Sequence, residues 1–263
     1  MKKIKDIIKA MEDFAPIRLK EDFDNVGLMV GNKDNEVKKI LLSLDCTLEV
    51  IEEAKEKGAN LIITHHPLLF IKPKSITTDT LVGKKIIELI KNDISLYSSH
   101  TNLDSASGGL NETIVNILGY DSKELIEVNK NARNSNEGLG RIIRLDKKIK
   151  LETLINEVKE KLNIDNLKVV KASEEVQNIA VINGSGSSFF DIAHRKGADC
   201  IITGDTTYHF ASDYKEMGVS IIDTGHFLSE WLVFLQVINK IKNQFEDVEV
   251  IISEHSKDPY TFA

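Results

Sequence analysis

The chain has too few cysteines and too little positive charge for several common classes of protein. Its 263 residues include only Cys46 and Cys200, which lie far apart and each within an apolar run. This spacing excludes a disulfide framework or a zinc finger and predicts two small buried side chains in a reducing compartment. The formal net charge of −7 disfavours electrostatically driven binding of duplex DNA or anionic membranes. We therefore do not expect nucleic acid as a partner.

Long apolar runs are also missing. No stretch approaches the roughly 18 to 20 apolar residues that a membrane span requires. The segment Met1–Ala15 carries Ile4, Ile7, Ile8 and Met11 at helical spacing with acidic residues among them, which predicts an amphipathic helix instead of a signal peptide. With 41% hydrophobic and 29% charged residues, the chain is typical of a globular protein with a buried core. We expect no membrane association and a cytoplasmic location.

Apolar runs of strand length alternate with amphipathic helical patterns, which indicates an α/β protein with helix-covered parallel sheets. The length favours one large or two modest domains. The expected strands are Ile40–Leu44, Leu61–Thr64, Ser95–Ser98, Arg141–Leu145, Lys168–Lys171, Ile179–Ile182, Cys200–Thr203, Ser220–Asp223 and Val248–Ile252. The expected helices are Leu48–Lys57, Val82–Lys91, Gly109–Leu118, Leu151–Leu162, Phe189–Lys196 and Leu228–Lys242. The polar, asparagine-rich segment Asn129–Glu137 is predicted to be a linker or surface loop.

An internal repeat suggests how these elements are organised. The segments Lys39–His66 and Asn178–Asp205 align without a gap, and eight of the 28 aligned positions are identical, including a Lys-Gly-Ala turn and the Thr that ends the second strand. The alternative is that two unrelated β-α-β units resemble one another. We favour a duplication, with two related α/β domains packed about a pseudo-twofold axis and a metal site between them. The first domain would comprise residues 1–126 and 235–263, and the second residues 127–234.

Two adjacent histidines at a strand end are the first candidates for chemistry. His65 and His66 follow the apolar run Leu61–Thr64, and Pro67 ends the regular structure. Carboxyl ends of strands in α/β sheets are where sites form. Taken alone, the two side chains are more often a polar strand ending, because most histidines bind no metal. Neighbouring side chains of a strand point in different directions. If both histidines bind metal, this geometry favours two ions over one.

Three more candidates lie elsewhere in the chain. His226 and Glu230 are four residues apart at the start of a helix, and Asp104 precedes a glycine-rich loop. Taken singly, the helix pair could be a solvated face and Asp104 a cap or Asx-turn. Together with His65 and His66 they offer three imidazoles and two carboxylates, which suit two divalent ions of zinc, iron, manganese, cobalt or nickel. Five ligands leave open positions, as in dinuclear hydrolases that activate water.

Five segments resemble one protein family in sequence and order. They are Phe23–Gly31, Leu61–Leu68, His100–Asp104, Thr203–His209 and Asp223–Glu230. In these motifs the chain is similar to the GTP cyclohydrolase 1 type 2 homologue family, also called Nif-three-like. The resemblance implies a dinuclear metal centre in a ring-shaped homohexamer, a toroid. It also implies that Glu230 bridges the ions, that His66 and Asp104 hold one ion, and that His65 and His226 hold the other.

The catalytic groups are less well defined. Tyr208 and His209 could donate a proton or hold a substrate, or could anchor a loop, and His100 could support a ligand or cap its strand. The loop Asn183–Ser188 could cradle a phosphate, although a tight turn is the preferred interpretation because it lacks the full nucleotide-binding patterns. We expect a metal-dependent hydrolase acting on a phosphorylated or nucleotide-like small molecule. The alternative is a non-catalytic hexameric scaffold that binds metal or a partner.

Overall fold

The computed structural model describes residues 2–122, 124–245 and 247–261. The chain divides into two compact units, of which the first is Met1–Leu103 with Ile238–Lys257 and the second is Asp104–Val237 with Asp258–Ala263. The sequence led us to expect the first boundary later, after residue 126. The structure assigns α5 (Leu110–Ile117) to the second unit because this helix contacts β6 and β8 of that unit's sheet.

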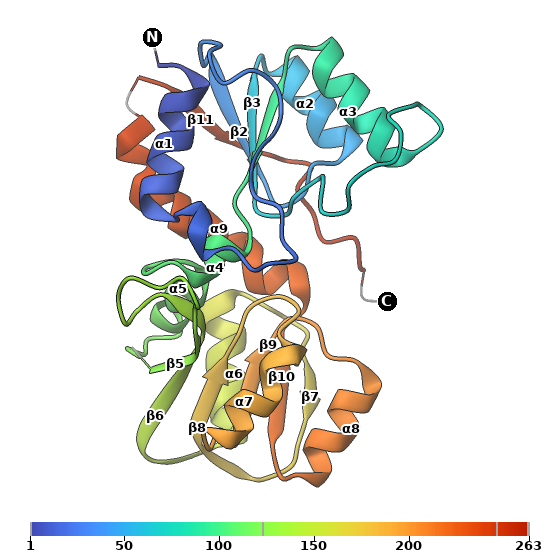
Figure 1. The fold of residues 1–263 in the computed structure, drawn as a ribbon. Helices are drawn as coiled ribbons and strands as arrows, with labels where there is room; N and C mark the ends of the chain where they lie inside the picture. Colours follow the sequence, from blue (N-terminus) through green and yellow to red (C-terminus); the bar gives the residue numbers. More distant parts are fainter. Residues whose placement is uncertain (1, 123, 246, 262–263) are drawn as a thin grey trace. The chain divides into compact units, whose positions relative to one another are not determined.

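The first unit is built on a five-stranded sheet with the order β1-β4-β3-β2-β11 (Figure 1). Its strands are β1 (Gly27–Val30), β2 (Lys39–Ser43), β3 (Leu61–Thr64), β4 (Ser95–Ser98) and β11 (Glu249–Ile252). Its helices are α1 (Ile4–Phe14), η1 (Ile17–Leu19), α2 (Leu48–Glu56), α3 (Leu81–Lys91) and η3 (Lys242–Phe245). All strand pairs are parallel except β1 with β4. Strand residues Leu41, Ile62 and Leu96 form a core with α2 and α3, and Figure 1 shows α1 on the opposite face.

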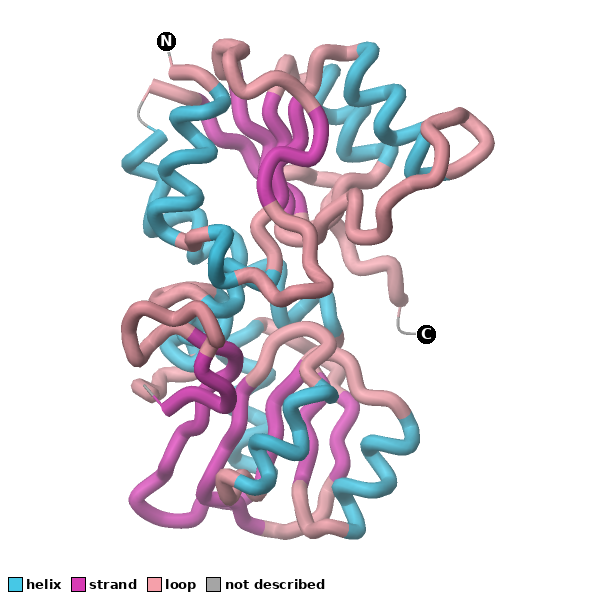
Figure 2. The backbone as a smooth tube through the Cα atoms, in the orientation of Figure 1, coloured by secondary structure: helices cyan, strands magenta, loops and turns pink. Residues whose placement is uncertain are grey.

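The second unit has a six-stranded mixed sheet with the order β5-β6-β8-β9-β10-β7 (Figure 2). Its strands are β5 (Glu124–Val128), β6 (Gly138–Lys150), β7 (Lys168–Val170), β8 (Glu175–Val181), β9 (Cys200–Thr203) and β10 (Ser220–Asp223). Besides α5, its helices are α6 (Leu151–Leu162), η2 (Ser187–Phe189), α7 (Phe190–Arg195) and α8 (Tyr208–Glu216). The helices α4 (Thr101–Ser105) and α9 (His226–Ile241) contain the boundaries between the units. Strands β8, β9 and β10 are parallel, whereas β5, β6 and β7 pair antiparallel.

The internal repeat is reproduced in the strand register and in the backbone hydrogen bonds. Ile40 of β2 pairs with Leu61 of β3, and the aligned residue Ile179 pairs with Cys200. The amide that follows each turn bonds to the same helical carbonyl, Ala59 N to Ala54 O at 2.8 Å and, in the second unit, Ala198 N to Ala193 O at 3.1 Å. The glycines of the two turns, Gly58 and Gly197, have φ angles of +70° and +85°, which glycine adopts without steric cost. The shared geometry supports a duplicated β-α-β unit.

Most predicted elements are present within one to a few residues of their expected ends. The main differences are in edge and surface elements. The structure contains β1, β5 and α8, which the sequence patterns did not indicate, and both sheets are mixed, whereas parallel sheets were expected. The polar segment at residues 129–137 is the loop between β5 and β6, as predicted (Figure 2). Both cysteines are buried, and burial raises the pKa of the Cys46 thiol to about 12, so they pack as small apolar residues.

A buried carboxylate in the first unit binds the segment that follows β11. Glu53 of α2 is 3% exposed and accepts hydrogen bonds from Ser253 Oγ, Glu254 N and Lys57 Nζ. Burial alone would favour the protonated acid, but these bonds and the lysine charge dominate and lower the pKa of Glu53 from 4.5 to about 2. The carboxylate form therefore stabilises the folded state at neutral pH.

This depressed pKa makes a prediction about acid stability. The stabilisation from Glu53 is complete above its unfolded pKa of about 4.5 and is lost as the pH falls towards about 2. We expect Glu53→Gln to lower the free energy of unfolding at pH 7 and to flatten its dependence on pH in that window. Urea unfolding between about pH 7 and pH 2, which spans the shift of Glu53, would measure this, with Glu52→Gln, an exposed neighbour, as the control. Parallel pH profiles for both variants would contradict the assignment.

Candidate metal centre

The adjacent histidines of the first unit lie at the carboxyl end of a central buried strand. All four residues of β3 are buried between β2 and β4, and Thr64 pairs with Ser43 on one side and Ser98 on the other. Because the three strands are parallel, their carboxyl ends share one edge of the sheet. His65 and His66 extend from that edge, where His65 is fully buried and His66 is half-buried. The rigid sheet therefore fixes the starting point of both side chains.

Each of these imidazoles has its Nδ1 atom held by an acceptor. His65 Nδ1 lies 2.8 Å from the carbonyl oxygen of Ser99, and His66 Nδ1 lies 2.9 Å from Asp45 Oδ1. A carbonyl oxygen can only accept, so Nδ1 of His65 carries a proton, and in the neutral ring the lone pair is then on Nε2. Metal-binding histidines typically donate one ring N–H to a carbonyl or carboxylate in this way, which orients the other nitrogen towards the ion.

A third imidazole, His100, joins this pair. Its ring centroid lies 5.2 Å from that of His65 and 5.7 Å from that of His66. One ligand nitrogen from each of the three rings lies within 4.8 Å of the others. His100 Nδ1 lies 2.9 Å from Asp24 Oδ1. The structure therefore brings His100 into the same cluster as the two predicted ligands.

Asp24 is a buried carboxylate that orients His100. Its second oxygen accepts from the backbone N and the Oγ1 of Thr101, at 3.1 and 2.5 Å. Burial favours protonation, but the hydrogen bond and charge of His100, together with the Thr101 bonds, outweigh it and lower the pKa of Asp24 to about 2. Asp24 is therefore ionised at neutral pH and fixes the orientation of the His100 ring.

The second unit provides a matching arrangement at its own strand ends. Strands β9 and β10 are parallel neighbours, and Asp205 follows the first while His226 follows the second. His226 Nδ1 lies 2.7 Å from Asp205 Oδ2. His226 Nε2 lies 3.1 Å from Glu230 Oε2, one helical turn further along α9. The predicted i,i+4 pair is therefore present, and its imidazole is oriented through Nδ1 as in the first unit.

Glu230 is 4% exposed, and its carboxylate lies against the backbone of Gly184. A Cβ atom on Gly184 would lie 2.1 Å from Glu230 Oε1 and 3.3 Å from His226 Nε2, and the φ of Gly184 is +56°. Gly184 N donates to Ser229 Oγ at 3.1 Å, and Ser229 Oγ donates to the His226 carbonyl at 2.8 Å. The loop and the first turn of α9 therefore hold one another in place.

Two asparagines connect Asp104 to this loop. Asn111 Nδ2 donates to the Asp104 carbonyl at 3.3 Å, and Asn111 Oδ1 accepts from Asn183 N at 3.1 Å. Asn111 is almost fully buried. Since Asn183 directly precedes Gly184, one hydrogen-bonded network links the Asp104 backbone to the loop beside Glu230. Asp104, His226 and Glu230 are thus all next to one hydrogen-bonded network of the second unit.

The remaining candidates differ in their surroundings. Tyr208 and His209 begin α8, and both side chains are exposed, Tyr208 to 80%. A proton donor needs a defined position relative to the reacting atoms, and exposure alone does not provide one. Residues 183–186 lie in the turn that follows β8, and Ser187 and Ser188 begin η2, so the segment is a strand-to-helix turn, as the preferred interpretation predicted.

Sequence reasoning missed the carboxylates that orient the rings. Asp45 and Asp205 each follow the end of a central strand, β2 and β9, so their positions carried a usable signal. In the repeat alignment Asp205 occupies the position of His66. Asp24, the partner of His100, precedes β1, which was not predicted as a strand.

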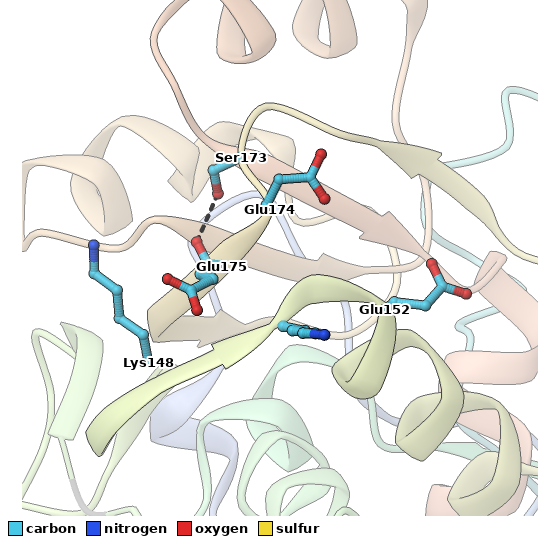
Figure 3. A pocket seen from close by; sticks show the side chains of 6 residues that line it. Lys148, Glu152, Ser173, Glu174 and Glu175 are labelled. Atoms are coloured by element: carbon cyan, nitrogen blue, oxygen red, sulfur yellow. Dashed lines mark hydrogen bonds between the residues drawn. The ribbon is translucent and has the colours of Figure 1, made fainter.

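A separate surface pocket of the second unit is unrelated to these residues (Figure 3). It measures about 490 Å³ and lies where β6 and β8 run beside the start of α6. It is lined by Lys148, Lys150, Glu152, Ser173, Glu174 and Glu175. Ser173 Oγ donates to the Glu175 carbonyl at 2.7 Å. Its lysines and glutamates make a mixed-charge surface with no member of the predicted site.

Comparisons with known proteins agree on one family. The family model described as Duf34/NIF3 (NGG1p interacting factor 3) matches residues 2–259. A relative from Clostridium perfringens named GTP cyclohydrolase 1 type 2 homolog is 56% identical over 99% of both chains, and a second, from Clostridium acetobutylicum, is 48% identical over 99% of this chain and 98% of the relative. The crystal structure of a Staphylococcus aureus hypothetical protein is similar, with a TM-score of 0.87, 32% identity and 99% of both chains covered.

Three further expectations concern the fold, membrane-spanning helices and metal binding. The mixed α/β architecture with two sheets is shared with solved structures over nearly the whole chain. Within the described residues, no helix is both long and apolar enough to cross a membrane. The histidine-rich cluster of the first unit can accommodate a metal ion.

Proposed function

The chain belongs to the Duf34/NIF3 family, and from that membership and the histidine geometry we propose that it is a dinuclear metal-dependent hydrolase. Its substrate would be a phosphorylated or nucleotide-like small molecule. The supporting observation is that His65, His66 and His226 each have Nδ1 held by a carbonyl or carboxylate oxygen. This arrangement is typical of metal-binding histidines.

We propose that five side chains hold two divalent ions, with Glu230 bridging, His66 and Asp104 on one ion, and His65 and His226 on the other. Imidazoles and carboxylates fit zinc, iron, manganese, cobalt or nickel. Five donors leave positions open for water and substrate. When bound, such ions polarise a phosphoryl or carbonyl oxygen and lower the pKa of water.

The surrounding residues have distinct roles in this proposal. Asp45, Asp205 and the Ser99 carbonyl orient the ligand imidazoles through Nδ1. His100, held by Asp24, is the candidate for hydrogen bonding or proton transfer to the substrate, because its ring is both oriented and within the cluster. Tyr208 and His209 are exposed and remain candidates for substrate contact. We also propose a homohexamer, which sedimentation of the purified protein would test.

The activity is tested by a screen with metal analysis in parallel. The purified protein, loaded separately with each of the five metals, would be assayed against phosphoesters, nucleotides and amides. We expect turnover that is lost in His66→Ala. If the protein carries its ions and none of these substrates is hydrolysed, the hydrolase proposal is wrong.

The orienting carboxylates provide a more specific prediction. Asp45→Asn and Asp205→Asn keep the side-chain shape but weaken the hold on Nδ1 of His66 and His226. We expect each change to lower metal affinity by about 10- to 100-fold, the usual effect of losing such a partner. Competition titration against a chelating dye would measure it. Asp79→Asn and Asp213→Asn, exposed carboxylates of the two units, serve as controls, and equal losses in all four variants would argue against the assigned roles.

A further inference from the structure

Two exposed phenylalanines lie beside the histidine cluster of the first unit. Phe23 is 67% exposed and Phe70 is 45% exposed. Their ring centroids are 6.1 Å apart with the planes inclined at 65°. The Phe70 centroid is 6.2 Å from that of His100. Exposed apolar groups that gather beside a polar site often mark a ligand-binding surface.

The segments that carry both rings are held by polar contacts. Asn25 Nδ2 donates to the Leu69 carbonyl at 2.9 Å, which ties the Phe23 segment to the Phe70 segment. Lys20 Nζ donates to the Asp24 carbonyl at 2.8 Å, and the Asp24 carboxylate binds His100 and Thr101. The residues next to each phenylalanine are therefore anchored to the same part of the unit as the histidines. The backbone that carries the aromatic pair is thus held at the edge of the cluster.

We propose that Phe23 and Phe70 form a subsite for the planar aromatic ring of the substrate. Rings inclined in this way offer a face and an edge, both of which aromatic ligands use. A base that stacks on an aromatic side chain gains more binding free energy than it would from an aliphatic group of equal size. Lys72 and Lys74 follow Phe70 and are exposed, so positive charge is available nearby for the anionic part of such a ligand. The inference rests on the proposed function, because it places this ring beside the metal ligands.

The test compares two ribose phosphates, one with an aromatic base at C1 and one with a hydroxyl group there. AMP and ribose 5-phosphate would be titrated into the full-length, metal-loaded protein by calorimetry. We expect AMP to bind about tenfold or more tightly than ribose 5-phosphate, within the range of stacking on one aromatic residue. Phe70→Leu and Phe23→Leu should each reduce that preference several-fold and leave the affinity for ribose 5-phosphate unchanged, whereas Phe70→Trp should retain it. Ile71→Ala, which removes a more exposed aliphatic neighbour (81%), should have no effect.

Several results would overturn the subsite. These are equal affinities for AMP and ribose 5-phosphate, no binding of AMP, or an unchanged preference in both leucine variants. A leucine variant that alters only the oligomeric state in sedimentation would identify the pair as a subunit contact instead. The outcomes separate the two proposals. Base-dependent AMP binding without turnover of any substrate contradicts only the hydrolase, and turnover without base preference contradicts only the subsite.

Discussion

Replacing Glu230 by glutamine is expected to abolish binding of the metal pair while leaving the fold intact. Glu230 is buried next to His226, and in the proposed centre it is the bridging ligand. Glutamine preserves the shape but removes the charge that balances two divalent ions. The loss in affinity should exceed the roughly 10- to 100-fold effect of losing an outer partner. Metal analysis after dialysis would measure it.

The stability of the same variant separates a lost ligand from a damaged fold. A ligand at 100 times its Kd stabilises the folded state by about 2.7 kcal/mol, so wild-type protein should melt at a higher temperature with metal than without it. Glu230→Gln should lose this metal-dependent rise but melt like the metal-free wild type. Glu216→Gln, an exposed glutamate of α8 in the same unit, should behave as wild type. A Glu230→Gln protein that retains both ions would refute the bridging role.

The second large effect is expected from Gly184→Ala. The added methyl carbon would lie 2.1 Å from Glu230 Oε1, and the residue has φ +56°. An alanine in the left-handed region costs about 1–2 kcal/mol, and relief of the clash requires Glu230 or the loop to move. We expect lower thermal stability and greatly reduced metal binding.

A matched glycine isolates the effect of the clash. Gly218 has φ +80°, and a Cβ atom there would have no neighbour within 4 Å. Gly218→Ala should therefore show the backbone cost alone, with normal metal content. Metal analysis and thermal melting of both variants make the comparison. If Gly184→Ala binds metal like Gly218→Ala, the close approach to Glu230 is not needed for the site.

The sequence predicted the central strands because each is a short buried apolar run bounded by polar or turn residues. Four of them, β3, β4, β9 and β10, have the predicted ends. The edge strands β1 and β5 were missed because their own sequences show no clear strand pattern. Each is recognised as a strand by its pairing with a neighbour, β4 or β6. Helix α8 was missed because its apolar face is short: Phe210 and Tyr214, four residues apart, pack on the core, and of these only Tyr214 is buried.

The candidate ligands could be named from the sequence, but the residues that orient them could not. Histidine and carboxylate at strand ends and at i,i+4 spacing are visible as patterns, whereas the hydrogen bond that selects one ring nitrogen depends on three-dimensional geometry. Asp45 and Asp205 follow strand ends in the sequence, but their role, like that of Asp24, is shown by the contact of each carboxylate with an Nδ1 atom. The same holds for Asn111 and Asn183, which connect the second-unit ligands through a backbone carbonyl and amide.

Anomalous diffraction from crystals grown with manganese or zinc tests the central claim most directly. The proposed centre predicts two peaks per chain. In the zinc form, imidazole nitrogens of His65, His66 and His226 should lie about 2.0–2.1 Å from an ion, with Nε2 as the binding atom in each. Glu230 should contact both peaks. A single peak, peaks bound through Nδ1, or ions held by other residues would contradict the account.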